Sequence, residues 1–174
     1  MSDGETRKYF GIYRGTVVDN VDPMLLGRIS VTVPGLSSII IPFTWAMPCV
    51  PITGIQMGTF MVPQIGAGVW IQFEAGDPDY PVWTGGWWRT PAEVPDLAYA
   101  GLPGDPNIVL QTSHQNALVI SDLPGPTGGI MLKSENGATI VVNDTGIYLE
   151  NGKGASLIMV GPTVDVNHGA LVVV

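Results

Sequence analysis

Cysteine and charged side chains are scarce in this chain of 174 residues. Cys49 is the one cysteine, so no disulfide can form within the chain, and its place beside Pro48 and Pro51 predicts a buried, unreactive thiol. Only 13% of the residues are charged, and the formal net charge is −8. A protein that coats nucleic acid needs a basic surface, so no nucleic-acid partner is expected.

Long apolar segments and familiar catalytic motifs are missing as well. The most apolar long run, residues 39–52, is interrupted by prolines and is too short to cross a bilayer. The first ten residues lack the apolar segment of a secretory signal, so we expect synthesis in the cytoplasm without a signal peptide. Gly66-Ala-Gly68 has no correctly placed third glycine for a dinucleotide fingerprint, and no Walker or zinc-binding motif occurs.

The acidic residues near the middle of the chain have two interpretations. Glu74, Asp77 and Asp79 are close enough in sequence to pair as acid and base in a hydrolase. Asp77 and Asp79, however, fall in a Gly- and Pro-containing turn, where aspartate is favoured for its bonds to the backbone. His114 is likewise expected to be a hydrogen-bonding turn residue. We therefore expect no catalytic site, no metal site and no cofactor.

The chain is nevertheless rich in hydrophobic residues. They make up 45% of the sequence, and the mean hydropathy of +0.30 is high for a soluble monomer. Because no segment can span a membrane, the excess favours association with further copies of the chain.

The first half of the sequence predicts a small β-barrel over residues 9–89, preceded by a polar tail, residues 1–8. Four of the five tryptophans, Trp70, Trp83, Trp87 and Trp88, lie in or just after the strongest predicted hairpin. We expect them to pack in the core and between subunits, with a sugar- or base-stacking platform as the alternative. Short strands with Gly-rich turns and no helical periodicity are predicted at residues 9–18, 27–33, 43–46, 60–62, 69–73 and 81–85.

A stiff linker rich in proline and glycine is predicted over residues 90–106, and a repetitive β region over residues 107–174. Short apolar runs recur there every 7–12 residues or so, and a repeat this small cannot bury a face alone. Three chains wound together would bury alternate residues along a common axis. The runs are residues 108–110, 117–120, 130–132, 139–142, 146–149, 156–160, 164–166 and 170–174. The predicted trimer core is Ile130, Leu132, Ile140, Val142, Leu149, Leu157, Val164 and Val166.

Several stretches together resemble one family. PQIGAGVWIQFEAGDPDYPVWTGGWW (63–88), residues 11–18, 27–34 and 45–48, and Asp22-Pro23 are similar to the OB-fold domain of spike proteins from contractile injection machines. These include the central spikes of contractile phage tails and the VgrG proteins of type VI secretion. Residues 110–122, 133–140 and 166–171 resemble the start and the end of the VgrG β-helical needle.

The resemblance implies an all-β protein with an N-terminal OB-fold barrel and a C-terminal intertwined trimeric β-helix. It implies a homotrimer that is assembled in the baseplate of a virion or phage tail-like particle and crosses a target membrane transiently. A separate hub protein would bind the barrel end, since the barrel starts near residue 9. A PAAR-type tip protein would dock at the C-terminal end, on Gly169, Ala170, Leu171, Val172, Val173 and Val174.

The sequence departs from some family members at two places. The linker stands where some phage spikes carry a lysozyme domain, so no wall-cleaving activity is expected. Some spikes bind iron at the tip through a His-x-His pair, whereas Asn167-His168-Gly169 has no second histidine, so His168 is expected to be a packing residue. The alternative from another class is a carbohydrate-binding OB module on a trimeric fibre-like stalk.

Overall fold

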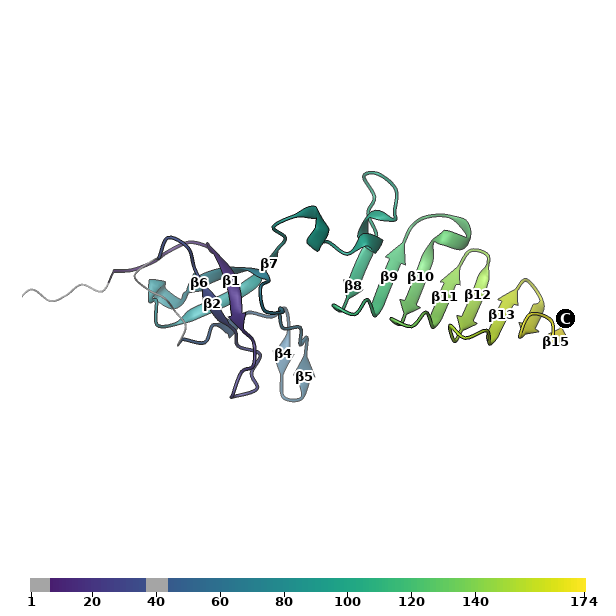
Figure 1. Ribbon diagram of the computed structural model, residues 1–174, viewed down its shortest axis with the longest axis horizontal. Helices are drawn as coiled ribbons and strands as arrows, with labels where there is room; N and C mark the ends of the chain where they lie inside the picture. Colours follow the sequence, from purple (N-terminus) through teal and green to yellow (C-terminus); the bar gives the residue numbers. More distant parts are fainter. Residues whose placement is uncertain (1–6, 37–43) are drawn as a thin grey trace, which may run out of the picture. The chain divides into compact units, whose positions relative to one another are not determined.

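The computed structural model describes residues 7–36 and 44–174, and the chain divides into two compact units, Met1–Pro91 and Ala92–Val174 (Figure 1). Strands and short 3₁₀ turns make up all the regular structure of these described residues, so the expected all-β class is confirmed. No helix in residues 7–36 and 44–174 has the length and apolar character needed to cross a bilayer.

The first unit is built on a five-stranded sheet with the order β2-β1-β6-β7-β3. Its neighbouring strands are antiparallel except β3 and β7, which are parallel. The β6–β7 pair is the hairpin that the sequence predicts most strongly, and it lies at the centre of the sheet. The strands are β1 (Tyr13–Asp19), β2 (Ser30–Thr32), β3 (Met47–Pro48), β6 (Gly68–Phe73) and β7 (Pro81–Trp87).

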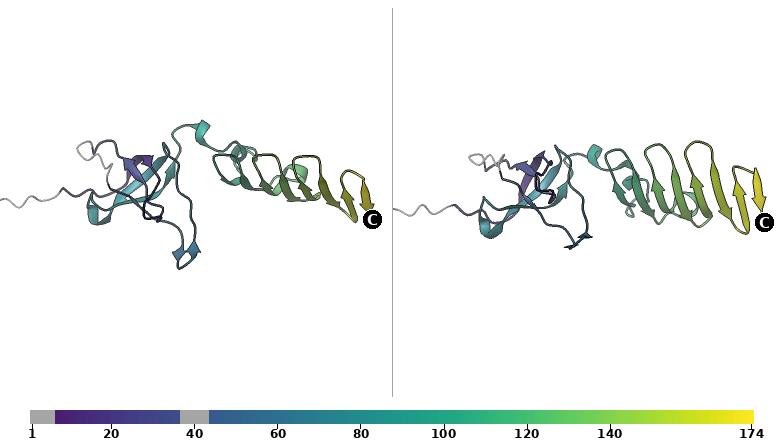
Figure 2. Two further views of the ribbon diagram at one scale, coloured as in Figure 1. Left: turned by 60° about the horizontal axis from the view of Figure 1, so that its bottom comes forward. Right: turned by 90° about the horizontal axis from the view of Figure 1, so that it is seen from below.

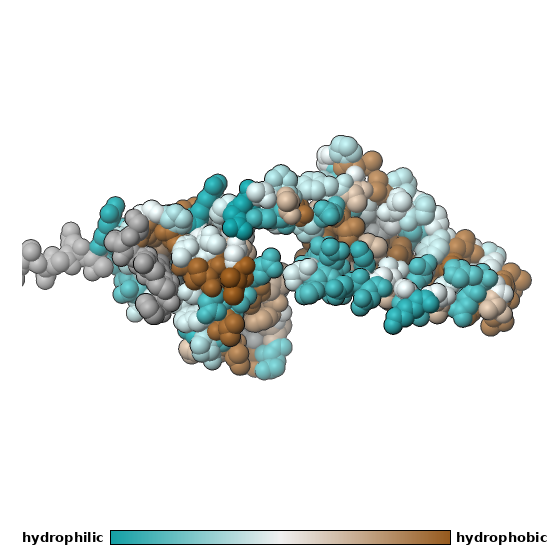
Figure 3. Space-filling view, in the orientation of Figure 1, coloured by the Kyte–Doolittle hydropathy of each residue, from teal (hydrophilic) through white to brown (hydrophobic). Residues whose placement is uncertain are grey.

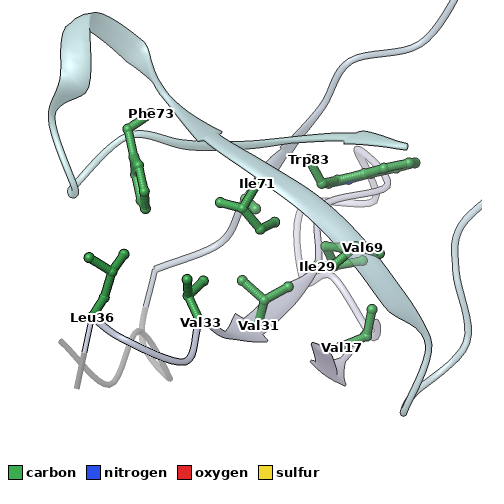
Figure 4. Close-up of a cluster of buried hydrophobic side chains, with 10 residues drawn as sticks. Val17, Ile29, Val31, Val33, Leu36, Val69, Ile71, Phe73 and Trp83 are labelled. Carbon is green, nitrogen blue, oxygen red and sulfur yellow. The ribbon is translucent and has the colours of Figure 1, made fainter. Parts of the chain in front are cut away.

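A hydrophobic core fills the first unit (Figure 4). Alternate residues of β1 and β6 point inward, so that Val17, Val69 and Ile71 are at most 1% exposed. Trp83 of β7 is buried beside them, and its indole N–H donates a hydrogen bond to the Gly27 carbonyl at 3.2 Å. This cluster closes within one chain; its buried members are Val17, Ile29, Val31, Val33, Leu36, Ala46, Val69, Ile71, Phe73 and Trp83.

The turn between β6 and β7 contains the 3₁₀ turn η1 (Glu74–Gly76). Gly76 has a φ of +75°, and the Asp79 N–H donates to the Asp77 carboxylate at 3.1 Å, which confirms the predicted turn chemistry. Residues 1–6 of the expected tail lie outside the described residues. Lys8, near the end of that tail, forms an ion pair with Asp77 at 3.3 Å.

The segment between β2 and β6 differs from the sequence-based prediction. Residues 60–62 do not form the predicted strand, so that prediction is wrong. The paired strands of this segment are β4 (Thr53–Gly54) and β5 (Met57–Gly58), which form a hairpin. Phe43, the start of another predicted strand, lies outside the described residues, and pairing near it consists of a bridge from Ala46 to Ile29 followed by β3.

Cys49 is exposed, so the expectation of a buried thiol is also wrong. Its backbone N–H pairs with Trp83 at the sheet edge, which leaves the side chain outside the core.

Residues 91–107 contain two short 3₁₀ turns, η2 (Pro91–Glu93) and η3 (Asp96–Tyr99). Asn107 ties this segment together, since its side-chain amide donates to the Leu97 carbonyl at 2.8 Å and its backbone N–H donates to Ala98. The turn η3 lies against β8, the first strand of the second unit.

The second unit is an eight-stranded antiparallel meander (Figure 2). Each of the eight predicted apolar runs overlaps one of its strands, so the β repeat is confirmed. The strands follow one another in sequence order, with a 3₁₀ turn η4 (Gly125–Thr127) in the β9–β10 connection. They are β8 (Ile108–Gln111), β9 (Ala117–Ser121), β10 (Gly129–Lys133), β11 (Thr139–Asn143), β12 (Gly146–Glu150), β13 (Ser156–Val160), β14 (Thr163–Val166) and β15 (Leu171–Val173).

The backbone ladder of this sheet is completed within one chain. Every strand between β8 and β15 is hydrogen-bonded on both sides to its neighbours in sequence. A strand-rich C-terminal sheet agrees with the expected β-helical needle, and the winding of three chains about one another stays a prediction.

Candidate functional site

One face of the second unit's sheet is apolar at every position of its strands. The antiparallel register places Leu110, Leu118, Leu132, Ile140, Leu149, Leu157, Val166 and Leu171 in one row across the sheet. A second row on the same face contains Ile108, Ile120, Ile130, Val142, Ile147, Met159, Val164 and Val173. These two rows are called the apolar face below.

The apolar face is open to solvent in a single chain. Ile108 is 65% exposed, Leu132 48% and Ile140 43%, although each is surrounded on its face by other apolar side chains. Monomeric proteins rarely expose a continuous apolar surface of this extent, and such a surface usually marks an interaction site. The residues therefore form a surface that is suited to contact with another protein surface.

The charged side chains of the strands lie on the opposite face. Lys133, Glu150 and Asp165 are the charged residues in β8 to β15, and their register partners are residues such as Thr139, Ser156 and Val172. Since neighbouring residues of a strand point to opposite faces, this segregation of charge follows from the alternation in the sequence.

All eight residues predicted for the trimer core lie on the apolar face. The sequence-based selection missed half of the face, because it chose residues within apolar runs without knowing the strand register. The missed residues are Ile108, Leu110, Leu118, Ile120, Ile147, Met159, Leu171 and Val173. Leu171 and Val173 were expected to bind a tip protein, and the register also aligns them with this face.

The predicted tip residues form the last turn and strand of the sheet. β15 pairs with β14 on one side and is the terminal strand in the order of the sheet. Leu171, Val172 and Val173 are between 50% and 58% exposed, and Val174 is 91% exposed. At the other end, η3 lies against β8, so the two edges of the sheet differ.

His168 lies in the turn before β15, where it packs against the start of β13. Asn167 accepts a hydrogen bond from the Ser156 N–H at 3.0 Å, and His168 Nε2 is 3.5 Å from the Ser156 hydroxyl. Among residues 7–36 and 44–174 no group of three or more potential metal ligands comes together. His114, also a turn residue, has its Nδ1 3.5 Å from the Glu135 carboxylate at the exposed edge.

The candidate acid–base residues of the first unit have structural partners. The Asp77 carboxylate accepts a hydrogen bond from the Asp79 N–H and also pairs with Lys8; the backbone bond is the larger reason why the pKa of Asp77 is lowered. These contacts stabilise the turn, and no contact joins Asp77 to a second carboxylate among those that the structure describes.

The four tryptophans of the β6–β7 region take different positions. Trp83 is in the core, whereas Trp70 and Trp87 lie on the outer side of the sheet, with their ring centres 6.1 Å apart. The Arg14 guanidinium lies over both rings, 5.6 Å from Trp70 and 4.8 Å from Trp87. Trp88 is 63% exposed. The Arg14 side chain thus covers part of the Trp70 and Trp87 rings.

An ion pair that the sequence analysis did not single out fixes the β1–β2 loop. The Asp22 carboxylate, 3% exposed, is 2.6 Å from Arg28 Nη2 and also accepts bonds from the backbone N–H groups of Met24, Leu26 and Arg28. The Arg28 guanidinium is the largest reason why the pKa of Asp22 lies well below its ordinary value of 3.8. A spacing of six residues in a loop gives no periodic signal that would have predicted this pair.

The comparisons with known families match both units. Residues 13–88 match the family model of the type VI secretion system/phage-baseplate injector OB domain. Residues 107–172 match the family model of the phage baseplate V C-terminal trimerisation domain, and this range contains nearly all of the apolar face. The comparison with curated proteins found no match.

Proposed function

Because the chain belongs to the phage-baseplate V family of injector spike proteins, we propose that it forms the needle which a contractile machine drives through a target membrane. The protein is a structural component of a baseplate and assembles as a homotrimer. Both matched families are structural, and the proposed work is mechanical.

The apolar face is the observation that carries this proposal. Three copies that turn this face toward a common axis would remove it from water, and burial of apolar surface is the main favourable term in association. The opposite face, which carries Lys133, Glu150 and Asp165, would then form the outside of the needle. In this arrangement the predicted core residues, with the other members of the apolar face, are the trimer contacts.

The tip-protein site is proposed at β15 and the turn before it. A terminal strand presents unpaired backbone N–H and C=O groups, which readily pair with a strand of another protein. A PAAR-type protein that docks on Gly169 to Val174 would extend the sheet and cover Leu171, Val172 and Val173, which are exposed in one chain. A hub protein of the baseplate is proposed to bind the first unit, called the barrel unit below because it matches the OB-domain model.

The mass of the particle in solution tests the proposed function. Light scattering of the purified full chain should give three times the chain mass of 18.4 kDa. The apolar face makes a stable monomer unfavourable, so a folded monomer at micromolar concentration would contradict the proposal. Deletion of residues 170–174 tests the tip site. It removes Leu171 and Val173 but leaves the rest of the apolar face, so the trimer should persist and capture of a PAAR-type protein should be lost.

A further inference from the structure

Two neighbouring segments of the first unit also expose apolar side chains (Figure 3). One is the β1–β2 loop, residues 20–27, and the other is the arm, residues 52–61, which contains the β4–β5 hairpin. Leu25 at the loop tip is 86% exposed, Ile55 at the arm tip 99%, and Phe60 at the arm base 74%. The exposed apolar residues of this loop–arm surface are Val21, Met24, Leu25, Leu26, Ile52, Ile55, Met57, Phe60 and Met61.

Hydrogen bonds and an ion pair hold the loop in this outward conformation. Both oxygens of the buried Asp22 carboxylate accept hydrogen bonds from within the loop, from the N–H groups of Met24 and Leu26. Leu25 has a φ of 57°, a left-handed conformation that is unusual for a leucine. A strained backbone and a buried ion pair thus keep a leucine pointing into solvent, which is typical of a surface that recognises a partner.

The loop and the arm adjoin each other. Gly27 lies so close to Phe60 that a Cβ built on the glycine would be 3.1 Å from the ring, and the Asn20 side chain donates to the Pro63 carbonyl at 3.0 Å. The two segments therefore present one surface, although they are separated in sequence by β2 and β3.

The loop–arm surface has the composition of an interface core. No charged residue occurs between Arg28 and Glu74 in the sequence, and the charge of Arg28 is paired with Asp22. Depletion of charge with exposed apolar and aromatic residues distinguishes the buried centre of interfaces from ordinary surface. The arm is also a hairpin of two very short strands, which is marginal in water without further contacts.

We propose that the loop–arm surface is buried between the barrel units of neighbouring copies in the homotrimer. This rests on the proposed function, because it takes the trimer as given. The match to a trimerisation domain makes other copies of the chain the expected partners, and an exposed apolar surface of this kind usually marks an interaction site. In a three-fold ring the contact is heterologous: each copy gives this surface to one neighbour and receives the neighbour's surface on a different face. The barrel would thereby add a contact to the trimer that the apolar face holds together.

Thiol accessibility in the full-length trimer tests the proposal. In a Cys49→Ser background, Ile55→Cys and Leu25→Cys place a single thiol on the surface, and Tyr80→Cys, at a position that is 61% exposed on the β6–β7 turn, is the matched control. In the trimer, labelling at positions 55 and 25 should be slower than at position 80 by at least about tenfold, because reaction requires local opening. All three should react equally fast in denaturant.

Photo-crosslinking identifies the protein that covers the loop–arm surface. A benzophenone side chain at position 55 should crosslink to the barrel of another copy, which mixed isotope-labelled and unlabelled chains distinguish from a crosslink within one chain. The same group at position 80 should give no such product.

The outcomes separate this inference from the proposed function. A particle that is not a trimer contradicts the proposed function itself. A trimer in which positions 55 and 80 label equally fast overturns only the inference. Protection that develops only after a baseplate hub protein is added would also overturn it, because the surface would then belong to the hub contact.

Discussion

The two units of this protein bury their apolar residues in opposite ways. In the barrel unit, Val17, Val69 and Ile71 are almost completely inaccessible within one chain. In the sheet unit, Ala117 and Val119 are the buried hydrophobic residues among those that the structure describes, whereas Leu132 and Ile140 are almost half exposed. The barrel unit thus has a core within one chain. The sheet unit, residues 92–174, has an exposed apolar face that further copies of the chain must cover.

This contrast shows how one chain can combine independent folding with obligatory assembly. A closed barrel buries its inward residues by itself, whereas a single meander sheet has two faces and can leave one uncovered. The sequence marks the difference by its pattern: turns and irregular segments separate the strands of the barrel, and short apolar runs recur regularly in the sheet. The first unit should therefore be able to fold without assembly, whereas the stability of the second should depend strongly on protein concentration.

The largest effect is expected from a charge on the apolar face. Ile140→Asp would bring three carboxylates together in a dry interior, where an unpaired charge costs several kcal/mol. The trimer should be lost in light scattering, while the near-ultraviolet signal of Trp83 in the barrel core remains. The neighbouring Thr139→Asp is the matched control, since residue 139 lies on the opposite face, and it should remain trimeric. Loss of assembly in both variants would argue against a face-specific effect.

A core truncation in the barrel should have the converse effect. Ile71 is completely buried, and Ile71→Ala should cost the barrel about 2–5 kcal/mol through lost transfer energy and a cavity. Chemical unfolding followed by tryptophan fluorescence measures this loss, and the mass of the particle should stay that of a trimer. Gln72→Ala, at the adjacent exposed position, should change stability by less than about 0.5 kcal/mol.

The fold could be predicted from sequence where the pattern is periodic. Eight apolar runs predicted eight strands, and the Gly76–Asp79 turn fixed the central hairpin of the barrel. The pairing of successive strands within one chain was not predicted; their short connections account for it. The full apolar face did not follow, since it depends on register, and a shift by one residue would exchange the two faces.

The segment between β2 and β6 was predicted least well. Residues 60–62 are apolar like a strand, but Phe60 packs over Gly27 and supports the β1–β2 loop instead. Local propensity does not reveal such a contact between distant segments. The Asp22–Arg28 ion pair was missed for the same reason. It depends on a loop conformation with a left-handed Leu25, and no periodic pattern in the sequence predicts that conformation.

The smallest effect is expected from the ion pair in the β1–β2 loop, and it should depend on pH. The pKa of Asp22 is lowered in the folded chain, so its carboxylate stabilises the fold fully above the ordinary pKa of 3.8. That contribution should disappear as the pH falls below 3.8 toward the depressed folded value, because the unfolded chain then binds a proton at Asp22 that the folded chain does not bind. Between pH 5 and pH 7 it should stay constant.

Asp22→Asn makes this dependence measurable, because asparagine resembles a protonated aspartate in shape and cannot form the ion pair. The variant should be less stable than the parent at pH 7, and the difference between their thermal midpoints should shrink as the pH falls below 3.8. Asp77→Asn is the comparison. Its pKa is also lowered, but its side chain is 29% exposed and its partner Lys8 45%, so solvent screens the pair and the change should be smaller. A difference between Asp22→Asn and the parent that is the same at pH 7 and pH 3 would show that Asp22 stabilises the loop through shape alone, without its charge.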